Sequence, residues 1–344
     1  MLAHAPRVQG ARHQAMNHSV KTIVEPASPA PVAYWRLVLR GCAQLCFQSN
    51  ELTGLCFLVA VLVASPVAFA YLLVAAALAP GGRMLLGERG PALDSGLPGL
   101  NPCLIALALP AFFHAGWNDI GMWGVLLLAV ASTVVLTRVA DVLLPFPTLA
   151  FPYVVTFWGL YALAAWLSVL QPIALGPTPP ESLHPVEAVL LGLGQALFSP
   201  AIGSGMLFFV GVLISNWRHA LLALCGAVIG TVMSCYHGGV TGFGDVDQGL
   251  YGFNGVLTAV SVFLFCGGKL RLSILGAVIA TMLMPAFAYL GLPALSAPFV
   301  LTTWLMLALG WLEDHWFDVS ASRGLPTAAA LQRDPAPRSP HPSS

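Results

Sequence analysis

The chain has 344 residues; 58% of them are hydrophobic, 8% are charged, and 14 basic side chains balance 14 acidic ones. Soluble globular domains carry about 25% charged residues, so the composition excludes an ordinary soluble domain and indicates a protein of the lipid bilayer. The balanced charge also excludes the basic surface that binds nucleic acid. We therefore expect a lipid bilayer, and no nucleic acid, among its partners.

Polar segments flank the apolar region. Residues 1–33 contain Arg7, Arg12 and Lys21 but lack the hydrophobic core of a signal peptide, and residues 319–344 are rich in proline. Both segments are typical of disordered tails. Basic residues before a first span favour the cytoplasmic side of the membrane for the N-terminal tail.

Apolar segments follow one another between the tails. Their approximate ranges are 34–48, 53–80, 100–117, 121–143, 149–171, 186–198, 205–235, 251–266, 270–290 and 295–312. A helix needs about 20 apolar residues to cross a bilayer, and the totals fit about ten spanning helices and two short re-entrant ones. A proline-rich linker, 173–185, divides them into a first membrane repeat, 34–172, and a second, 186–318.

Three motifs occur twice in the same order. They are Gln44-x-x-Phe47 and Gln195-x-x-Phe198; the Gly-Leu-x-Gly-x-Asn turns Gly96–Asn101 and Gly249–Asn254; and Leu144-Pro145-x-x-Thr148 and Leu292-Pro293-x-x-Ser296. The copies lie 151, 153 and 148 residues apart, and this regular offset indicates internal duplication. If each half holds an odd number of spans, the second is inserted upside down, and a shared site lies near the midplane between discontinuous helices.

The polar residues of these motifs are all uncharged. A buried amide without a partner costs about 2–7 kcal/mol, so their duplication favours a symmetric polar path, although such side chains also hold membrane helices together. No duplicated acidic pair lies in the apolar segments, whereas proton-coupled carriers usually display one. The pattern favours passive passage of a neutral, hydrogen-bonding solute.

Phe47 and Phe198 follow the glutamines by one helical turn and therefore share their face. Facing aromatic rings can form a flat slot that admits a planar molecule and removes its water. The alternative is ordinary packing, which is the usual role among the 18 phenylalanines of the chain.

A few charged residues permit other interpretations. Asp245 and Asp247 resemble a metal-binding pair, and His114 with Asp119 resembles an acid–base pair, but both patterns are frequent by chance. We expect no metal, no cofactor and no catalytic residue. Arg138 and Asp141 are three residues apart, which predicts a structural ion pair on one helix face.

These motifs resemble those of the urea transporter family. The resemblance covers about residues 41–312 and rests on Gln44-x-x-Phe47 with Asn50, Thr53 and Gly54, on Gly249–Asn254, and on Leu144-Pro145-x-x-Thr148. It implies an all-α polytopic membrane protein with two inverted repeats, each of five transmembrane helices plus one re-entrant half-helix, surrounding a central pore. It also implies a homotrimer with one pore in each protomer, passive single-file passage of urea, and, for a bacterial member, the inner membrane.

The resemblance further implies a set of pore-lining residues. By position they are Gln44, Phe47, Leu100, Leu104, Thr148, Gln195, Phe198, Phe253, Leu257 and Ser296. Phe253 and Leu257 would complete the slot of Phe47. Leu100 and Leu104 would complete the slot of Phe198, and Thr148 and Ser296 would form the constriction between the slots.

Three of these positions depart from the family pattern. Ser296 stands in place of threonine, Leu100 in place of a common aromatic residue, and Gln195 in place of the glutamate of some members. These departures affect selectivity among close analogues of urea.

Three other functions stay open at this point. The first is a channel for another small neutral amide or for ammonia. The second is a membrane-embedded enzyme that uses Asp245, Asp247 or His114, and the third is a sensor or scaffold that transports nothing.

Overall fold

The computed structural model describes residues 32–173, 184–241 and 248–316, except the side chains of 236–241 and of 314. The predicted C-terminal tail, all but the last two residues of the N-terminal tail and most of the linker lie outside these residues. Every regular element in the described part is a helix, and one isolated bridge joins Phe113 to Pro172. The predicted all-α class is confirmed for this part of the chain.

The helices form two matched series. The first contains α1 (Tyr34–Ala43), η1 (Gln44–Cys46), α2 (Glu51–Ala64), α3 (Pro66–Leu85), α4 (Pro91–Asp94), η2 (Leu97–Gly99), α5 (Leu100–Phe112), α6 (Ile120–Leu143) and α7 (Phe151–Leu163). The second contains α8 (Pro185–Gln195), α9 (Ile202–Ser215), α10 (Trp217–Thr241), α12 (Gly252–Phe265), α13 (Leu270–Tyr289) and α14 (Ala297–Trp316). The starts of α1, α2, α3, α5, α6 and α7 precede those of α8, α9, α10, α12, α13 and α14 by 146 to 152 residues.

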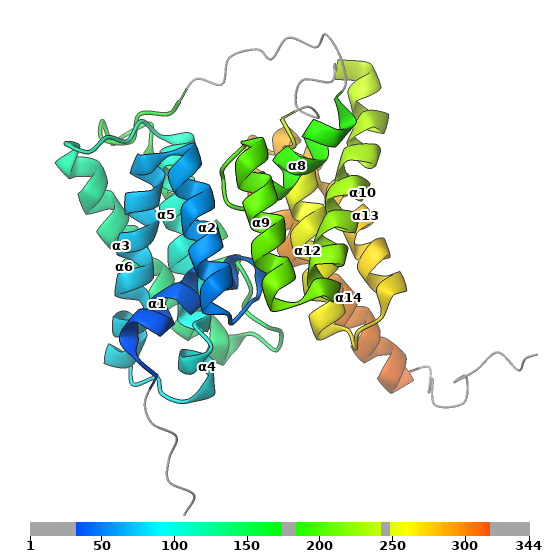
Figure 1. Ribbon diagram of the computed structural model, residues 1–344, viewed down its shortest axis with the longest axis horizontal. Coiled ribbons are helices and arrows are strands. Elements are labelled where there is room, and N and C mark those ends of the chain that lie inside the picture. The colour runs from blue at the N-terminus through cyan, green and yellow to red at the C-terminus, as the bar shows by residue number, and fades with distance from the viewer. Residues whose placement is uncertain (1–31, 174–183, 242–247, 317–344) are drawn as a thin grey trace, which may run out of the picture. The chain divides into compact units, whose positions relative to one another are not determined.

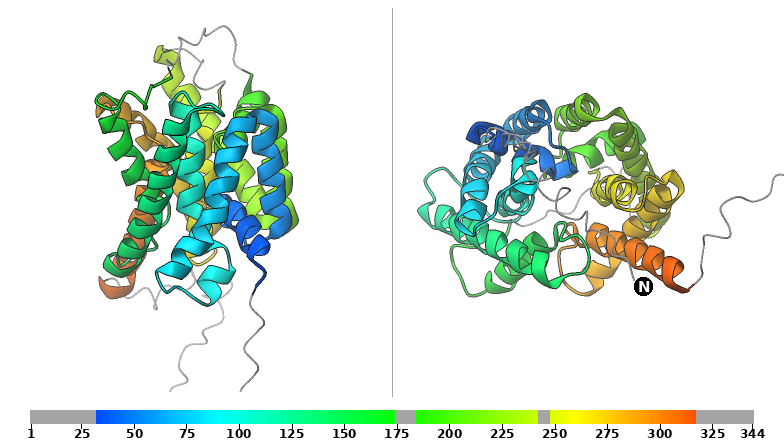
Figure 2. Two further views of the ribbon diagram at one scale, coloured as in Figure 1. Left: turned by 90° about the vertical axis from the view of Figure 1, so that its left-hand side faces the viewer. Right: turned by 90° about the horizontal axis from the view of Figure 1, so that it is seen from below.

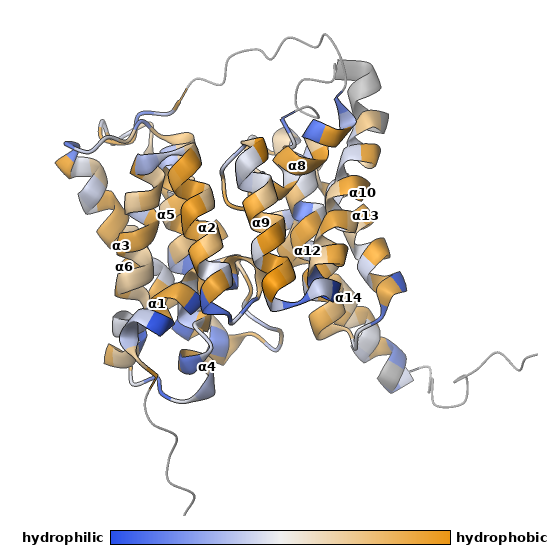
Figure 3. Ribbon diagram, viewed as in Figure 1, coloured by the Kyte–Doolittle hydropathy of each residue, from blue (hydrophilic) through white to orange (hydrophobic). Residues whose placement is uncertain are grey.

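Four of the described helices are long and apolar enough to cross a membrane: α3, α6, α13 and the Trp217–Cys235 part of α10. The pair formed by α1 with η1 and α2 is bent by 73° and could be a fifth span. Figure 3 shows that these helices are hydrophobic along most of their length, with hydrophilic residues mainly at their ends and in the loops. The chain is therefore a multi-pass membrane protein, whereas the count of ten spans stays a prediction.

The two series meet where α2 lies beside α9. Figure 1 shows α3, α5 and α6 on one side of this pair and α10, α12 and α13 on the other. The Thr53 hydroxyl donates to the Gly211 carbonyl, and the Ser204 hydroxyl donates to the Ala60 carbonyl, both at 2.7 Å. Because the start of each helix bonds to the later part of the other, these two matched helices run antiparallel, as an inverted repeat requires.

A stacked aromatic pair lies at the centre of this contact. The rings of Phe57 and Phe208 are 5.0 Å apart and within 5° of parallel. The two residues occupy matched positions, 151 residues apart. Contact between equivalent groups is what a twofold axis between these rings produces, and it agrees with the antiparallel course of α2 and α9.

The series meet again through α7 and α14, which lie side by side in the view from below in Figure 2. The Trp158 indole N–H donates to the Pro293 carbonyl, and the Trp304 indole N–H donates to the Pro147 carbonyl, each at 2.9 Å. Each half therefore holds the loop that precedes the last helix of the other half.

Two matched glycines allow the broken helices to cross their neighbours closely. A Cβ atom on Gly54 would lie 1.9 Å from the Leu39 carbonyl oxygen, and one on Gly205 would lie 1.9 Å from the Leu190 carbonyl oxygen. Since both obstacles are backbone atoms, no side-chain rotation can make room. The contacts between α1 and α2 and between α8 and α9 therefore require glycine.

Replacing Gly205 by alanine should destabilise the protein. Overpacking costs about 1–3 kcal/mol, occasionally more, so we expect a lower melting temperature and poorer recovery of monodisperse protein in detergent. Gly203→Ala is the control, because Gly203 lies on the same helix with open space around it. Equal melting temperatures for Gly205→Ala and Gly203→Ala would contradict the close crossing of α8 and α9.

Candidate functional site

Each broken helix is tied to a glycine-rich turn through its glutamine. Gln44 Nε2 donates to the Ser95 carbonyl at 2.9 Å and lies 3.0 Å from the Ser49 hydroxyl. Gln195 Nε2 donates to the Gln248 carbonyl at 3.2 Å. Both accepting carbonyls directly precede a Gly-Leu-x-Gly-x-Asn turn. Two of the duplicated motifs are therefore in contact within each half, and both glutamines position the backbone of the turns.

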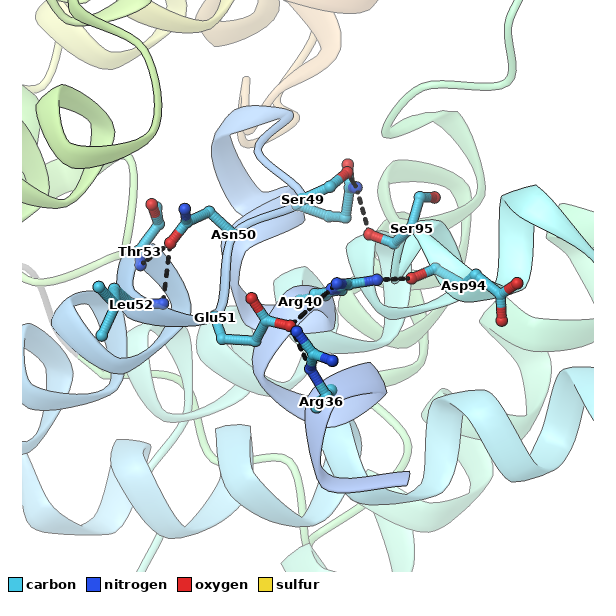
Figure 4. Close-up of polar contacts among 10 residues, drawn as sticks. Arg36, Arg40, Ser49, Asn50, Glu51, Leu52, Thr53, Asp94 and Ser95 are labelled. Carbon is cyan, nitrogen blue, oxygen red and sulfur yellow. Dashed lines mark hydrogen bonds and ion pairs between the residues drawn. The ribbon is translucent and has the colours of Figure 1, made fainter. Parts of the chain in front are cut away.

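A charged network surrounds the break between α1 and α2 (Figure 4). Arg36 and Arg40 pair with the Glu51 carboxylate at 2.6 and 2.9 Å, and Arg40 also donates to the Asp94 carbonyl at 2.7 Å. The Asn50 side chain caps α2 by accepting two backbone N–H groups of its first turn. These contacts fix the angle at which the broken helix resumes.

Phe47 and Phe198 have the same strained backbone. Their φ angles are +57° and +53°, in the left-handed region, which non-glycine residues adopt at a cost of about 1–3 kcal/mol. Each N–H donates to the carbonyl of the preceding motif glutamine, Gln44 or Gln195, at 2.9 Å. The backbone of each half thus directs one phenylalanine away from the helix that precedes it.

Phe47 stands against two aromatic rings of the other half. Its ring centroid lies 6.3 Å from that of Phe265, at the end of α12, and 5.8 Å from that of Phe299, in α14. Leu100, at the start of α5, lines one cavity together with Phe47 and Phe265. These four residues are called the first aromatic cluster below.

Phe198 has the matched surroundings. Its ring centroid lies 6.4 Å from that of Phe112, at the end of α5, and 6.4 Å from that of Tyr153, in α7. These three residues are called the second aromatic cluster. The helices α5 and α12 have 13 and 14 residues, and each carries a member of the first cluster at one end: Leu100 at the start of α5 and Phe265 at the end of α12. Phe112, at the other end of α5, belongs to the second cluster. At 1.5 Å per residue, α5 therefore spans the distance of about 20 Å between the two clusters.

The predicted wall partners therefore need correction. Leu100 belongs with Phe47 of its own half, because the start of α5 lies at the first cluster and its end at the second. The end of α12, with Phe265, lies at the first cluster, so we expect its start, with Phe253, to lie beside Phe198 at the second. Leu104 and Leu257 lie in the buried core, each 2% exposed.

Asn101 holds the loop before α7. Its Nδ2 donates to the Leu149 carbonyl at 3.0 Å, and its Oδ1 accepts the Tyr153 N–H at 3.1 Å. Leu149 has a φ of +51°, so the asparagine stabilises a second strained residue and also caps the helix. Both polar atoms are satisfied within the protein, which favours the helix-linking role over a place in a polar path.

Asn254 makes the same two bonds before α14. Its Nδ2 donates to the Leu295 carbonyl at 2.9 Å, and its Oδ1 accepts the Phe299 N–H at 3.1 Å. Leu295 also has a positive φ, +48°. The two loops therefore match with an offset of 146 residues, since Leu149 corresponds to Leu295 and Tyr153 to Phe299.

This offset corrects the predicted equivalence of Thr148 and Ser296, which rested on aligning the Leu-Pro pairs. The structure matches Thr148 with Ala294 and Ser296 with Ala150. The physical reason is that the helix before the first loop is longer, since α6 has 24 residues and α13 has 20, whereas the loops 144–150 and 290–296 are equally long. Pro293 therefore corresponds to Pro147 and not to Pro145, and the matched indole bonds to these two carbonyls agree with this.

Thr148 and Ser296 accordingly have different surroundings. The Thr148 hydroxyl donates to Asp141 Oδ1 at 2.5 Å. Ser296 is 1% exposed and lies near the Tyr153 hydroxyl, a buried group without a hydrogen-bond partner of ordinary geometry in the described part. Sequence reasoning missed Tyr153, although its hydroxyl is the feature that distinguishes it from its counterpart Phe299.

A cavity of about 190 Å³ lies beside the first cluster. Its lining consists of Phe47, Arg83, Leu97, Pro98, Leu100, Asn101, Thr137, Asp141, Pro147, Thr148, Leu149 and Phe265. A larger hollow, of about 250 Å³, lies against α6 and α7 and is almost entirely apolar, so it offers nothing to a polar solute.

The predicted pair of Arg138 and Asp141 is not formed. Asp141 Oδ2 accepts from Arg83 Nη2 at 2.7 Å, and its other oxygen is taken by Thr148. Arg83 lies 58 positions earlier in the chain. Helical spacing relates only residues that are close in sequence, so it could not predict this pair.

The enzyme-like residues have structural roles or lie outside the described residues. Asp119 caps α6 by accepting the Met122 N–H at 3.0 Å, and the His114 backbone bonds to Gln171. Asp245 and Asp247 fall in an undescribed segment. No group of three or more potential metal ligands exists among the residues that were placed.

Matched broken helices, antiparallel contact across a pseudo-twofold axis and apolar spans define a polytopic membrane protein built by duplication. The family model described as urea transporter matches residues 35–310, so the chain belongs to the urea transporter family. Because this family consists of transport proteins and not of enzymes, the prediction that the chain is no enzyme is confirmed.

Three relatives illustrate the similarity. Urea transporter 1 of Capra hircus is 25% identical over 336 residues, covering 89% of this chain and 86% of that protein. Urea transporter 1 of Ovis aries is 25% identical over 344 residues with the same coverage. Urea transporter 1 of Mus musculus is 25% identical over 304 residues, covering 82% of this chain and 78% of that protein.

Removing the Asn254 side chain should destabilise the fold before it affects passage of a solute. Asn254→Ala loses two bonds and leaves buried backbone groups unpaired, at about 1–3 kcal/mol for each. We expect a lower melting temperature in detergent without any solute present. Asn118→Ala, at an exposed loop position, is the control. Unchanged stability together with altered flux would assign Asn254 to the pathway instead.

Proposed function

We propose that the protein is a passive channel through which urea passes in single file between the two aromatic clusters. The observation that carries this proposal is the matched pair of strained phenylalanines, each facing two aromatic rings of the other half. Membership of the urea transporter family and relatives named urea transporter 1 support urea as the solute.

The two clusters provide flat apolar slots. Urea is planar and neutral, so it can enter such a slot at the cost of its water alone. An ion would lose far more hydration free energy in the same place without a compensating charge. The slots therefore favour a small planar solute over ions by the difference in desolvation cost.

Hydroxyl groups replace part of the lost water between the slots. We propose that Ser296 and Tyr153 form this polar element, since both are buried and the Tyr153 hydroxyl has no bond of ordinary geometry in the described part. Ala150 stands where the second half has Ser296, and Tyr153 stands where it has Phe299. The first half thus supplies its hydroxyl from Tyr153, three residues after Ala150, the position that matches Ser296.

The pathway needs no ion gradient. Coupled carriers place titratable carboxylates along their path. Among the described residues, Arg83 is the buried residue with a permanent charge, and it is paired with Glu88 and Asp141. A carboxylate held in an ion pair is poorly suited to pick up and release a proton in each cycle, which supports passive passage.

The proposed lining keeps the ten predicted residues with the corrected partners. Phe47 and Leu100 form one slot, Phe198 and Phe253 form the other, and Leu104 and Leu257 extend along α5 and α12. Gln44 and Gln195 position the two mouths, while Ser296 lies between the slots and Thr148 at the first mouth.

We also propose a homotrimer in a bacterial inner membrane. The resemblance to the family supports this assembly. Large apolar side chains on the spanning helices, among them Leu128, Leu143 and Tyr289, are 73–92% exposed in one protomer. Such surfaces require lipid or another copy of the chain.

Purified protein in liposomes should release urea rapidly in stopped-flow light scattering. Proton and sodium gradients should leave the rate unchanged, because the pathway has no coupling group. Empty liposomes give the background, and formamide, acetamide and ammonia are measured alongside urea. Accumulation of urea against its gradient would show a coupled carrier, and absence of flux from folded trimers would exclude a urea channel.

Tyr153→Phe should lower urea permeability about threefold to tenfold, the effect of one hydrogen bond of ordinary strength. Tyr71→Phe is a matched control, because Tyr71, on α3, is also buried and its hydroxyl has no partner among the described residues, but its ring packs against Trp123 of α6. Melting temperatures show whether both variants are folded. Equal losses of flux in the two variants, or none in Tyr153→Phe, would remove Tyr153 from the pathway.

A further inference from the structure

A buried arginine borders the cavity beside Phe47. We propose that this cavity is an entry site in which Arg83 Nη1 donates a hydrogen bond to the carbonyl oxygen of a neutral amide solute. The inference rests on the proposed function, since it concerns the first step of solute passage. It adds a charged recognition group that the uncharged motifs did not predict.

The orientation of Arg83 is held by two carboxylates. Its Nε pairs with Glu88, and its Nη2 donates to Asp141 Oδ2 at 2.7 Å. The Thr148 hydroxyl then donates to the other oxygen of Asp141 at 2.5 Å. A guanidinium is planar with fixed donor directions, so these bonds leave Nη1 as the free end of a fixed group.

Arg83 Nη1 is unusual because it is a buried donor without a bond in the part of the chain that the structure describes. Arg83 is 5% exposed, and its Nη1 has no hydrogen-bond partner among the described residues. A buried donor without an acceptor is costly, and such groups usually have a partner. Arg83 lines the cavity, and we infer that an acceptor bound there meets this donor.

The cavity has room for such an acceptor. Its volume of about 190 Å³ exceeds that of a small planar amide, since one water molecule takes up about 30 Å³ in the liquid. Phe47 and Leu100 provide apolar walls on the slot side. A solute bound to Arg83 therefore lies next to the first aromatic cluster, ready to enter it.

The net charge of the group formed by Arg83, Glu88 and Asp141 disfavours one class of solute. One guanidinium stands between two carboxylates, which leaves a net negative charge and disfavours anions. The Asp141 side chain is 35% exposed, so its carboxylate can accept an N–H of the solute whose carbonyl faces Arg83. The class of ligand is a neutral molecule that carries a carbonyl oxygen beside an N–H group.

In the described part of the second half, the matched position carries a different residue. The position matched with Arg83 is Ser234, a buried residue whose hydroxyl donates to the Thr231 carbonyl of its own helix at 2.8 Å. The two mouths of the pathway therefore differ in chemistry. Recognition of the carbonyl group occurs at the Phe47 end, whereas the other end relies on its slot.

Solid-state NMR can test the contact directly. Protein with 15N-labelled arginine side chains is reconstituted in liposomes with carbonyl-13C urea, and dephasing of the urea carbon by 15N reports their proximity. We expect dephasing in the wild type and its loss in Arg83→Lys. Arg40→Lys is the matched control, because Arg40 is also held by a carboxylate and a carbonyl but does not line the cavity.

Flux measurements separate this inference from the proposed function. We expect Arg83→Lys to lower urea and formamide flux about tenfold or more, the worth of a hydrogen bond to a charged group, and to leave ammonia flux unchanged. If Arg83→Lys does not fold, Asp141→Asn, which keeps an acceptor for Thr148, should weaken both dephasing and urea flux. Urea flux in the wild type without Arg83-dependent dephasing would overturn the entry site and leave the channel. Dephasing without flux would support the site and overturn the channel.

Discussion

Backbone groups at membrane depth need hydrogen-bond partners inside the protein, and the structure depends on how this requirement is met at its breaks. Gln44 and Gln195 bind the carbonyls before the glycine-rich turns, and Asn101 and Asn254 bind the loops before α7 and α14. Each amide side chain thus replaces backbone bonds that a continuous helix would make. These bonds allow the helices to end within the apolar region.

The breaks have a second consequence, because they force four non-glycine residues to positive φ. Two of them, Phe47 and Phe198, then face aromatic rings supplied by the opposite half. Neither cluster can form within one repeat alone. The antiparallel contact of α2 with α9 therefore determines the two aromatic clusters as much as the phenylalanines do.

Exact twofold symmetry would make the two ends of the proposed pathway identical and would give its centre equivalent residues from both halves. The chain departs from this symmetry at one end and at the centre. Arg83 has Ser234 as its counterpart, and Tyr153 has Phe299. The duplicated framework supplies the slots, while single-copy residues supply charge and an extra hydroxyl. In the proposed channel, selectivity among small amides therefore depends on residues that occur in only one of the two repeats.

The amino-acid sequence by itself determined the membrane class, the duplication and the family, because these depend on hydropathy and on motifs whose residues are neighbours in the chain. It could not determine the register of Thr148 against Ser296, since the first loop contains two consecutive X-Pro pairs and the second pair, Phe146-Pro147, is the one that matches Leu292-Pro293. The partner of Asp141 and the slot of Leu100 were also beyond it. Only the tertiary structure decided these, because they depend on which groups meet when helices distant in the chain pack together.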